Sequence, residues 1–387
     1  MSTTGRSEAD APAASDVASR LESAAFVRLL AARTAGGVAA VGLLAGALDD
    51  CGVPYQTSVV GFPAAAANGT DADVTLALGR PAETGQTAIG AGGDPAATAA
   101  YDVAAELGSP DPVLALAGTI GSGRQPGSDL LGDVTERGVE RRPGIAAPAV
   151  DPADALAYST LVHAPFSGNR EAAAETLGGL EVPEPLDADA RKQVASAVAL
   201  AVAGDRSATE RGTHAVERFL HPLAGGPFGT VGGFGDVLAA TARERPGLAT
   251  MLALGGGDTE TALSVWRDHG TRAHEAVREA ATGRYDGLSV ARATATDGAV
   301  PVCTVARLLR AYRSPEPVVL VVADGVAEAR AASVGSTLPD DAAGIGRAMA
   351  TAAAQVGGNG AGTATRGRAT YDCSPTEFVA AFREVVQ

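Results

Sequence analysis

The sequence of 387 residues contains very few lysines, aromatic residues and cysteines. Lys192 is the only lysine, and aromatic residues make up 4% of the chain, in which Ala, Val and Gly dominate, so its core has to be built from small side chains. The three cysteines, Cys51, Cys303 and Cys373, are far apart and odd in number, which indicates neither a disulfide framework nor a zinc site. We expect them to be small buried residues.

Long hydrophobic runs are also missing. No apolar segment reaches the roughly 20 residues that a membrane-spanning helix needs. Residues Met1 to Ser15 are polar and small, without the basic start and apolar stretch of a signal peptide. These absences predict a cytoplasmic protein with no membrane partner.

The charge is strongly unbalanced, with 45 acidic against 30 Lys and Arg residues and a net charge of −15. An acidic surface almost free of lysine suits a cytoplasm rich in KCl, where charges are screened and hydrated carboxylates keep a protein soluble. We therefore predict a halophilic protein. Net acidity of this origin does not argue against a nucleic-acid partner, so a local cluster of arginines is more informative than the total charge.

The length predicts two domains. After a leader expected to be disordered, Val17 to Ala32 reads either as one helix or as a short helix followed by a strand, Ala25 to Leu30. Short β-branched segments then alternate with helical ones, which predicts a parallel α/β sheet whose sites form where its strands end. The predicted elements are a helix at 38–48, strands at 55–60, 74–78 and 87–89, and helices at 96–107, with Asp94 as N-cap, and 112–120.

The middle of the chain, from about Asp151 to Ala281, is predicted to be mainly helical, and the last section returns to α/β character. His269 lies in a run, Ser264 to Arg272, whose pattern indicates an exposed helix face. The predicted elements are helices at 186–203, 210–220 and 259–281, a glycine-rich bend at 225–234, a buried strand at 317–323, a helix at 342–356, a strand at 369–373, and a capping box at 374–377 that opens the final helix.

A glycine-rich stretch near the C-terminus is the strongest candidate binding element. Glycines permit positive φ and bring backbone N–H groups close to an anion, and two arginines that follow add fixed forks of donors. We interpret the stretch as a phosphate-facing loop, with a helix C-cap and a turn as the alternative. Its candidate nucleic-acid-binding residues are Gly357, Gly358, Asn359, Gly360, Gly362, Arg366 and Arg368.

Two further features bear on nucleic-acid binding. Arg124, Arg137, Arg141 and Arg142 form a looser basic cluster, for which ordinary surface charge is the favoured reading. Aromatic residues on which bases of a single strand could stack are few. The candidates are Tyr371, Phe228 and Phe234.

The C-terminal block from Val356 to Val386, with its Gly-Gly-Asn-Gly and Thr-Arg-Gly-Arg segments, resembles the DHH phosphoesterase superfamily, and in particular archaeal RecJ-like exonucleases and GINS-associated nucleases. The resemblance implies an N-terminal parallel α/β domain that carries a two-manganese site and a smaller C-terminal domain that holds nucleic-acid phosphates. The implied organisation is a leader at 1–16, a DHH-like domain at 17–150, a helical connector at 151–285 and a C-terminal domain at 286–387.

The metal motifs that the resemblance implies are replaced in this chain. Two-metal hydrolysis needs several converging carboxylate or imidazole ligands. The family's first motif contains a His, two Asp and a Gly, of which this chain keeps only the glycine. The family has a further Asp at the end of the strand that corresponds to 74–78, and this chain lacks it. The family's Asp-His-His is replaced in this chain by glycines and an alanine. The vestigial positions are Thr34, Gly36, Gly37, Ala77, Gly90 and Gly92. We therefore expect no catalytic residue, no metal and no cofactor.

The expected function is that of a catalytically inactive RecJ-like protein of DNA replication or repair. By the resemblance, its partners would be single-stranded DNA or RNA and a replisome component such as GINS or the replicative helicase complex. An alternative is an active Mn²⁺-dependent, single-strand-specific 5′–3′ exonuclease with a rearranged metal site. A third reading is a small-molecule or nucleotide sensor that reuses the pocket near Gly36 and Gly90.

Overall fold

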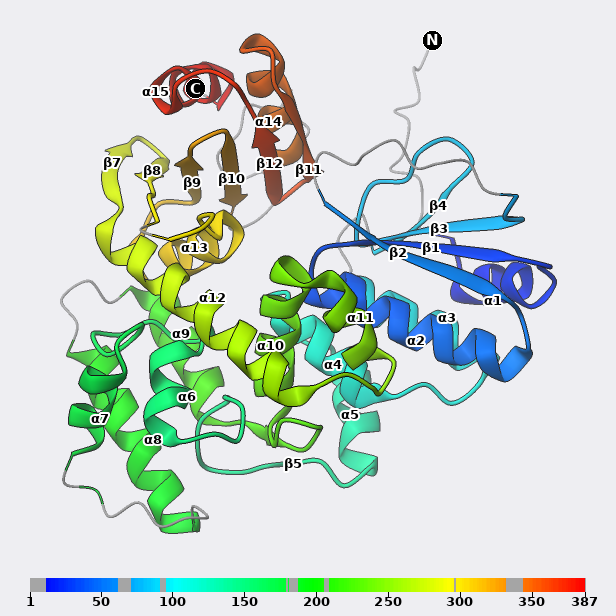
Figure 1. The fold of residues 1–387 in the computed structure, drawn as a ribbon, viewed down its shortest axis with the longest axis horizontal. Helices are drawn as coiled ribbons and strands as arrows, with labels where there is room; N and C mark the ends of the chain where they lie inside the picture. The colour runs from blue at the N-terminus through cyan, green and yellow to red at the C-terminus, as the bar shows by residue number, and fades with distance from the viewer. Residues whose placement is uncertain are drawn as a thin grey trace, which may run out of the picture.

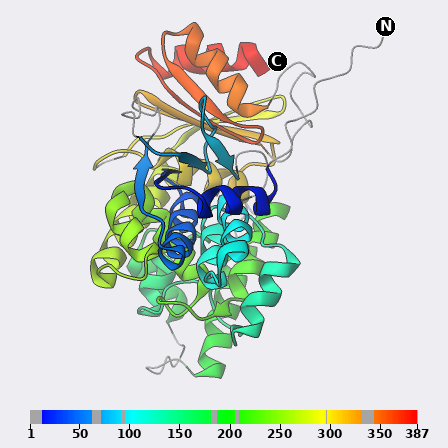
Figure 2. The same ribbon diagram turned by 90° about the vertical axis from the view of Figure 1, so that its right-hand side faces the viewer.

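Two β-sheets, one from each end of the chain, organise the molecule, and the helices of the middle lie below both of them (Figures 1 and 2). The structure, a computed structural model, describes residues 12–61, 71–90, 95–178, 180, 187–204, 209–295, 297–331 and 344–386. No helix in these ranges is both long and apolar enough to cross a membrane.

The N-terminal sheet has four parallel strands in the order β2-β1-β3-β4. They are β1 (Val27–Ala32), β2 (Tyr55–Val60), β3 (Val74–Leu78) and β4 (Thr87–Ile89). The three strands predicted at 55–60, 74–78 and 87–89 are confirmed to the residue. Residues 17–32 follow the second alternative, a short helix and then a strand, because Val27, Leu29 and Leu30 are fully buried in the centre of the sheet.

Five helices belong to this end of the chain: α1 (Ala14–Glu22), α2 (Ala35–Cys51), α3 (Ala96–Leu107), α4 (Pro112–Gly121) and α5 (Ser128–Glu136). The leader was predicted to extend to residue 16, but α1 already begins at Ala14, where Val17 and Leu21 give it an apolar face to bury. Pro95 rather than Asp94 is the N-cap of α3, and Asp94 lies outside the described residues.

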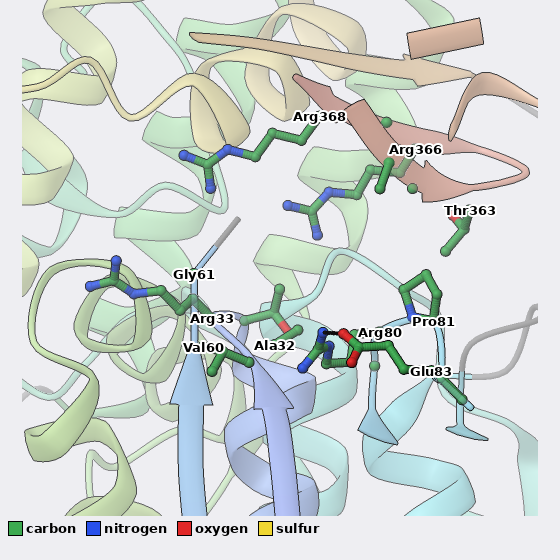
Figure 3. A pocket seen from close by; sticks show the side chains of 16 residues that line it. Ala32, Arg33, Val60, Gly61, Arg80, Pro81, Glu83, Thr363, Arg366 and Arg368 are labelled. Carbon is green, nitrogen blue, oxygen red and sulfur yellow. Dashed lines mark hydrogen bonds and ion pairs between the residues drawn. The ribbon is translucent and has the colours of Figure 1, made fainter. Parts of the chain in front are cut away.

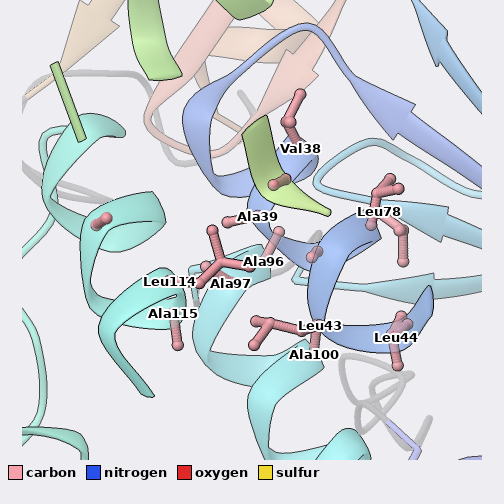
Figure 4. Packing of buried hydrophobic residues seen from close by; sticks show 14 of the residues in the cluster. Val38, Ala39, Leu43, Leu44, Leu78, Ala96, Ala97, Ala100, Leu114 and Ala115 are labelled. Atoms are coloured by element: carbon pink, nitrogen blue, oxygen red, sulfur yellow. The ribbon is translucent and has the colours of Figure 1, made fainter. Parts of the chain in front are cut away.

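The core beneath this sheet is built from small side chains, as predicted (Figure 4). In Figure 1, α2, α3 and α4 lie below the strands. A Cβ on Gly118 of α4 would lie only 2.4 Å from Ala39 Cβ of α2 and 2.8 Å from Ala97 Cβ of α3. Such close helix approach compensates for the scarcity of aromatic residues, because interiors must reach high packing density whatever their side chains.

The middle of the chain is helical, as predicted. Its elements are β5 (Glu140–Arg141), α6 (Pro152–Tyr158), α7 (Arg170–Leu177), α8 (Ala188–Ala203), α9 (Glu210–Leu220), β6 (Leu223–Ala224), α10 (Val231–Glu244), α11 (Pro246–Ala253) and α12 (Thr259–Glu279).

Two predictions for this part are wrong. The bend predicted at 225–234 ends at Thr230, whose side chain caps α10 by accepting a hydrogen bond from the Gly233 N–H. His269 is not on an exposed face: it is 1% exposed and lies between Glu244, 2.7 Å from its Nδ1, and Thr304, 2.9 Å from its Nε2.

The helices α10 and α11 turn back to pack on the N-terminal domain. Val237 and Leu238 of α10 share one hydrophobic cluster with residues of α2 and α4. Glycines set the closest approach, because a Cβ on Gly235 of α10 would lie 2.4 Å from the Ala117 carbonyl of α4. These two helices therefore extend the core of the N-terminal domain.

The C-terminal sheet has six strands in the order β11-β12-β10-β9-β8-β7, with β8 and β9 parallel and the other pairs antiparallel. Its elements are β7 (Ala281–Tyr285), β8 (Leu288–Arg292), α13 (Val302–Leu308), the π-helix η1 (Leu309–Arg313), β9 (Val318–Ala323), β10 (Val326–Ala331), α14 (Ile345–Gln355), β11 (Asn359–Thr363), β12 (Arg366–Thr370) and α15 (Pro375–Val386).

The strand predicted at 317–323 is confirmed as β9, and all of its residues are buried. The strand predicted at 369–373 starts three residues earlier, at Arg366. The capping box is confirmed, since Glu377 N–H donates to Ser374 Oγ at 3.3 Å and Ser374 N–H donates to Glu377 Oε2 at 2.9 Å. The fold class is thus the predicted one, a parallel α/β domain, a helical region and a C-terminal α/β domain.

A buried pair of histidines links α12 to the segment before α7. The Nδ1 atoms of His163 and His274 lie 3.0 Å apart, and His274 Nε2 lies 3.0 Å from the Ser159 carbonyl oxygen. Because a carbonyl only accepts, neutral His274 carries its proton on Nε2 and accepts the Nδ1–H of His163. Arg313 in turn donates to His163 Nε2 at 3.2 Å. Both rings are satisfied in the neutral state.

This pair is expected to make the protein less stable in acid. Burial lowers the pKa of His274 to about 4 and that of His163 to about 2, against an ordinary value near 6.5. At a pH between 6.5 and its lowered pKa, each histidine binds a proton in the unfolded chain but not in the folded chain. The free energy of unfolding therefore falls as the pH drops below 6.5, by about 1.4 kcal/mol per pH unit for each histidine in that range.

Denaturant titrations at several pH values check this. The variant His163→Gln/His274→Gln should show a weaker dependence of unfolding free energy on pH, whereas His214→Gln, on the exposed face of α9, serves as the matched control. Equal pH slopes for the double variant and the wild type would contradict the prediction.

Candidate nucleic-acid interface

A cleft of about 400 Å³ separates the ends of the N-terminal strands from the C-terminal sheet (Figure 3). One wall comes from the segments that follow β1, β2 and β3, and the other comes from the hairpin of β11 and β12. The lining residues are Ala32, Arg33, Thr34, Val60, Gly61, Gly79, Arg80, Pro81, Ala82, Glu83, Ala361, Gly362, Thr363, Arg366, Gly367 and Arg368. The volume is within the range of roughly 300–1,000 Å³ that is usual for ligand sites.

The lower wall follows from the topology of the parallel sheet. Parallel strands end at the same edge, so the residues after β1, β2 and β3 meet there. These are Arg33, Gly61 and Gly79, and Arg80 comes next. Gly79 has a φ of +66°, a conformation that side-chain-bearing residues rarely adopt, and it turns the chain so that Arg80 reaches the cleft. The site therefore lies where the sequence predicted sites to form.

The glycine-rich stretch is a β-hairpin, not a loop. Asn359–Thr363 is β11 and Arg366–Thr370 is β12, and only Gly357 has a positive φ, at +74°, where α14 ends. The glycines serve to bring the hairpin onto α14. A Cβ on Gly360 would lie 2.4 Å from the Met349 carbonyl oxygen, and one on Gly367 would lie 2.4 Å from Met349 Cγ. Their backbone N–H groups are therefore constrained by the sheet and do not form the cradle that we predicted.

Of the predicted binding residues, Gly362, Arg366 and Arg368 line the cleft. Gly357, Gly358, Asn359 and Gly360 do not, because they lie at the far end of the hairpin or against α14. In Figure 3, the side chains of Arg366 and Arg368 enter the cleft from the hairpin above.

Four arginines and one acid line this cleft. The Nε atoms of Arg33 and Arg368 are buried and have no hydrogen-bond partner among the described residues. Arg80 forms an ion pair with Glu83 at 3.2 Å. The cleft thus carries an excess of positive charge, and two of its guanidinium groups retain buried donors that an anion could satisfy.

Arg366 also has a structural partner. Its Nε donates to Glu328 Oε1 at 2.5 Å and its Nη2 to Cys303 Sγ at 3.1 Å. Glu328 is fully buried, and Arg330 lies 3.5 Å from the same Oε1. Burial alone would raise the pKa of Glu328, but Arg366 and Arg330 outweigh burial and hold that pKa below its usual value. Glu328 is therefore an ionised anchor for Arg366. Cys303 is buried, as predicted, whereas Cys51 and Cys373 are half-buried.

The vestigial metal positions have structural roles where the structure describes them. Thr34 caps α2 by accepting from the Gly37 N–H at 3.1 Å, and the Gly36 N–H donates to Ser122 Oγ at 2.9 Å. Ala77 is buried in β3, and Gly90 has a φ of +70° before α3. Gly92 lies outside the described residues.

The residues of this cleft do not fit the pair of manganese ions that the resemblance implies. Within the described ranges, no three His, Cys, Asp or Glu side chains come close enough to hold a metal ion. The segments that follow β1 and β3 instead carry Arg33 and Arg80, whose positive charges would repel a cation. The donor set suits an anion.

Two arginines of the cleft were not predicted, and three predicted aromatic residues do not lie at the surface. Arg33 directly follows β1 and Arg80 is the second residue after β3, so the rule that sites form at strand ends could have found them. Tyr371, Phe228 and Phe234 are at most 4% exposed and offer no surface for base stacking. The four arginines of the looser cluster do not form one site. Arg137 donates to the Pro110 carbonyl at 3.1 Å, and Arg142 pairs with Glu140 at 3.9 Å. Arg124 and Arg141 line another pocket.

Comparison with known sequences gives one relative along the whole chain. "Uncharacterized protein rrnAC1427" of Haloarcula marismortui is 48% identical over 393 residues, which cover 100% of both chains. A protein-family profile described as "Uncharacterized protein rrnAC1427, C-terminal domain" matches residues 280–384.

Solved structures with a similar fold include CDC45 from Entamoeba histolytica, with a TM-score of 0.56 at 8% identity over 93% of this chain and 95% of that one. RecJ in complex with Mg²⁺ from Thermus thermophilus has a TM-score of 0.44 at 15% identity over 97% of this chain, which spans only 51% of the RecJ chain. A DHH domain, PF0399, has a TM-score of 0.48 at 10% identity. The CDC45 match supports a shared fold.

Proposed function

The chain belongs to the same family as rrnAC1427 of Haloarcula marismortui, and we propose that it binds the phosphate backbone of single-stranded DNA or RNA in its arginine-lined cleft without cleaving it. The observation that carries the proposal is the donor set of the cleft. Arginines from two separate sheets face one cavity at the edge where a metal site would be expected, and those described residues hold no metal-ligand cluster.

The arrangement fits a chain of phosphates better than a single small anion. Arg33 and Arg80 come from one wall of the cleft, and Arg366 and Arg368 come from the other. A nucleic-acid strand that passes between the walls would present successive phosphates to both. Because the three candidate aromatic residues are buried, binding would depend on charge more than on base stacking, with little sequence preference.

The variant Arg33→Gln/Arg368→Gln tests this proposal. Each substitution removes one charged donor without touching the Glu328 pair. We expect each lost contact to weaken binding by about tenfold, and the slope of log affinity against log salt to become shallower by roughly 0.7 per contact. Fluorescence anisotropy of a labelled oligonucleotide, at several KCl concentrations, measures both quantities.

The matched control is Arg137→Gln/Arg142→Gln, which removes two exposed charges outside the cleft. It lowers the total positive charge equally but should leave the affinity within about twofold if the cleft is the binding site. Equal losses in both variants would show that binding follows net charge alone and would reject the cleft.

The exonuclease alternative makes the opposite prediction for the same protein. Cleavage of an end-labelled single strand in molar KCl with Mn²⁺, abolished by a chelator, would show that metal ligands are supplied by residues outside the set described here. Absence of product at large enzyme excess would support non-catalytic binding.

A scaffolding role is a second candidate, supported by the fold shared with CDC45. By the resemblance to RecJ-like proteins, the partner would be GINS or the replicative helicase complex, and the protein would act in DNA replication or repair in a halophilic cytoplasm. Co-purification of tagged protein with GINS in molar KCl tests this role. Binding that survives nuclease treatment would support it, whereas loss of the complex on nuclease treatment would indicate tethering by nucleic acid.

A further inference from the structure

A second basic pocket, of about 200 Å³, lies on the helical side of the molecule and shares no lining residue with the cleft. Its charged lining consists of Arg124, Arg141, Arg218, Arg307 and Arg310, with His221 beside them. No Asp or Glu of the described chain is among its lining residues. Five arginines thus line one small cavity without an acid in its wall.

These arginines come from separate elements. Arg124 follows α4, Arg141 belongs to β5, Arg218 to α9, Arg307 to α13 and Arg310 to η1. Their convergence therefore does not follow from one helix periodicity, and the antiparallel pairing of β5 with β6 brings Arg141 opposite Leu223, shortly after the end of α9. The only π-helix of the described chain carries Arg310, and π-helical turns occur frequently at functional sites.

The hydrogen bonds that Arg307 and Arg141 make go to uncharged groups, and the acid that acts on Arg307, Asp236, does not line the pocket. Arg307 donates to the Thr160 carbonyl at 2.9 Å and to Thr160 Oγ1 at 2.7 Å, and Arg141 donates to the His221 carbonyl at 3.0 Å. All of these acceptors are neutral. Arg310 Nε is buried and has no hydrogen-bond partner among the described residues.

The environment of Arg310 shows the same imbalance. Burial lowers its pKa, and the other contribution, from Arg211, acts in the same direction because Arg211 is also a cation. The Nη2 of Arg211 donates to the backbone carbonyls of Ser314 and Glu316, so Arg211 brings no negative charge near Arg310. Arg307 and Arg310 are half-buried and Arg124, Arg141 and Arg218 are exposed at the rim, and an anion held among these cations would reduce their mutual repulsion.

We propose that this pocket binds a small phosphate-type oxyanion, with Arg218 and Arg310 as its principal ligands. Planar guanidinium forks match the oxygens of a tetrahedral oxyanion, and each can donate two parallel hydrogen bonds. The cavity is smaller than the roughly 300–1,000 Å³ of sites for drug-sized ligands, so it suits a free anion such as inorganic phosphate and not a whole nucleotide. The site is independent of nucleic-acid binding in the cleft.

Isothermal titration of potassium phosphate into the full-length protein in molar KCl tests the proposal. We expect saturable binding of one phosphate per chain, weakened at least tenfold in Arg218→Gln/Arg310→Gln. The cleft variant Arg33→Gln/Arg368→Gln should bind phosphate as the wild type does, which separates this site from the cleft. No saturable binding to the wild type, or equal affinity in the Arg218→Gln/Arg310→Gln variant, would overturn the proposal.

Further measurements distinguish phosphate binding in this pocket from other causes of the same result. Arg310→Lys keeps the charge but loses the fork, so it should fold and bind phosphate with an affinity between those of the wild type and Arg310→Gln. Phosphate should also raise the melting temperature of the wild type and not that of the double variant. Loss of phosphate binding in the presence of excess 5′-phosphorylated oligonucleotide would assign the pocket to a nucleic-acid phosphate and overturn the free-anion assignment.

Discussion

Replacing Arg366 with Gln is expected to lower the free energy of unfolding by about 3–5 kcal/mol, the usual effect of removing one partner from a buried ion pair. The substitution leaves the carboxylate of Glu328, which is fully buried, with Arg330 at 3.5 Å as its remaining close cation. Since whole domains are stable by only about 5–15 kcal/mol, this single change would remove a large part of the total. Denaturant unfolding followed by circular dichroism measures it.

The neighbouring Arg368→Gln is the matched control, because Arg368 lies on the same strand and lines the same cleft without a buried carboxylate partner. It should change the unfolding free energy by less than about 1 kcal/mol. The double variant Glu328→Gln/Arg366→Gln should recover part of the loss, since no buried charge is then left without its partner. An Arg366→Gln protein as stable as the wild type would show that Arg330 alone suffices.

This result also decides how the cleft is tested. A double alanine substitution of Arg366 and Arg368, the obvious choice from the sequence, would reduce DNA binding partly by unfolding the protein. Arg33 and Arg368 are the better pair because neither is hydrogen-bonded to Glu328.

Replacing Asp236 with Ala is expected to cost at least about 4 kcal/mol, because it leaves several buried donors without an acceptor. Asp236 is 1% exposed, and its carboxylate accepts four hydrogen bonds. Two come from Thr160, through N–H at 2.9 Å and Oγ1 at 2.5 Å, one comes from Ser159 Oγ at 3.0 Å, and one comes from the Trp266 indole at 2.9 Å. The residue thereby joins α10, α12 and the segment after α6.

Trp266 is the only tryptophan of the chain, so its fluorescence reports directly on this junction. The Asp236→Ala variant should unfold at a lower denaturant concentration with an altered native emission spectrum. Asp268→Ala, at an exposed position on the same helix as Trp266, is the control and should shift neither. Unchanged emission and stability in Asp236→Ala would mean that water replaces the carboxylate.

Three strands of the N-terminal sheet, β2, β3 and β4, could be predicted to the residue because each is a short apolar or β-branched run next to Pro, Gly or Asp, whereas β1, predicted at 25–30 in one of two alternatives, lies at Val27–Ala32. The hairpin of β11 and β12 could not be predicted. The alternate residues Gly360 and Gly362 of β11 have no side chains to show the period of two, and Gly360 is required by the nearby α14, of which the local sequence carries no sign.

His269 was misjudged for a related reason. It stands next to Asp268 in a charged run, and such a run usually marks the outer face of a helix. Here α12 is packed between α10 and α13, so a residue that points away from one neighbour still meets another, as the contacts of His269 with Glu244 and Thr304 show. Sequence periodicity finds one buried face of a helix and does not find two.

The arginines at the strand ends were missed because the resemblance directed attention to the absent acids. At the positions after β1 and β3 the resemblance implies metal ligands, and an arginine there is a ligand for an anion instead. The general rule for parallel sheets placed the site correctly, whereas the chemistry of the site required both of its walls to be known.

The helix α12 has a consequence for how this family is divided into parts. The family profile begins at residue 280, immediately after α12, yet Ala273, Ala276 and Val277 of that helix belong to the same hydrophobic cluster as Val319 and Val321 of β9. A fragment that starts at 280 would expose the rest of this cluster to water and tend to aggregate. The segment that the profile matches and the unit that folds therefore have different boundaries, and α12 is the difference between them.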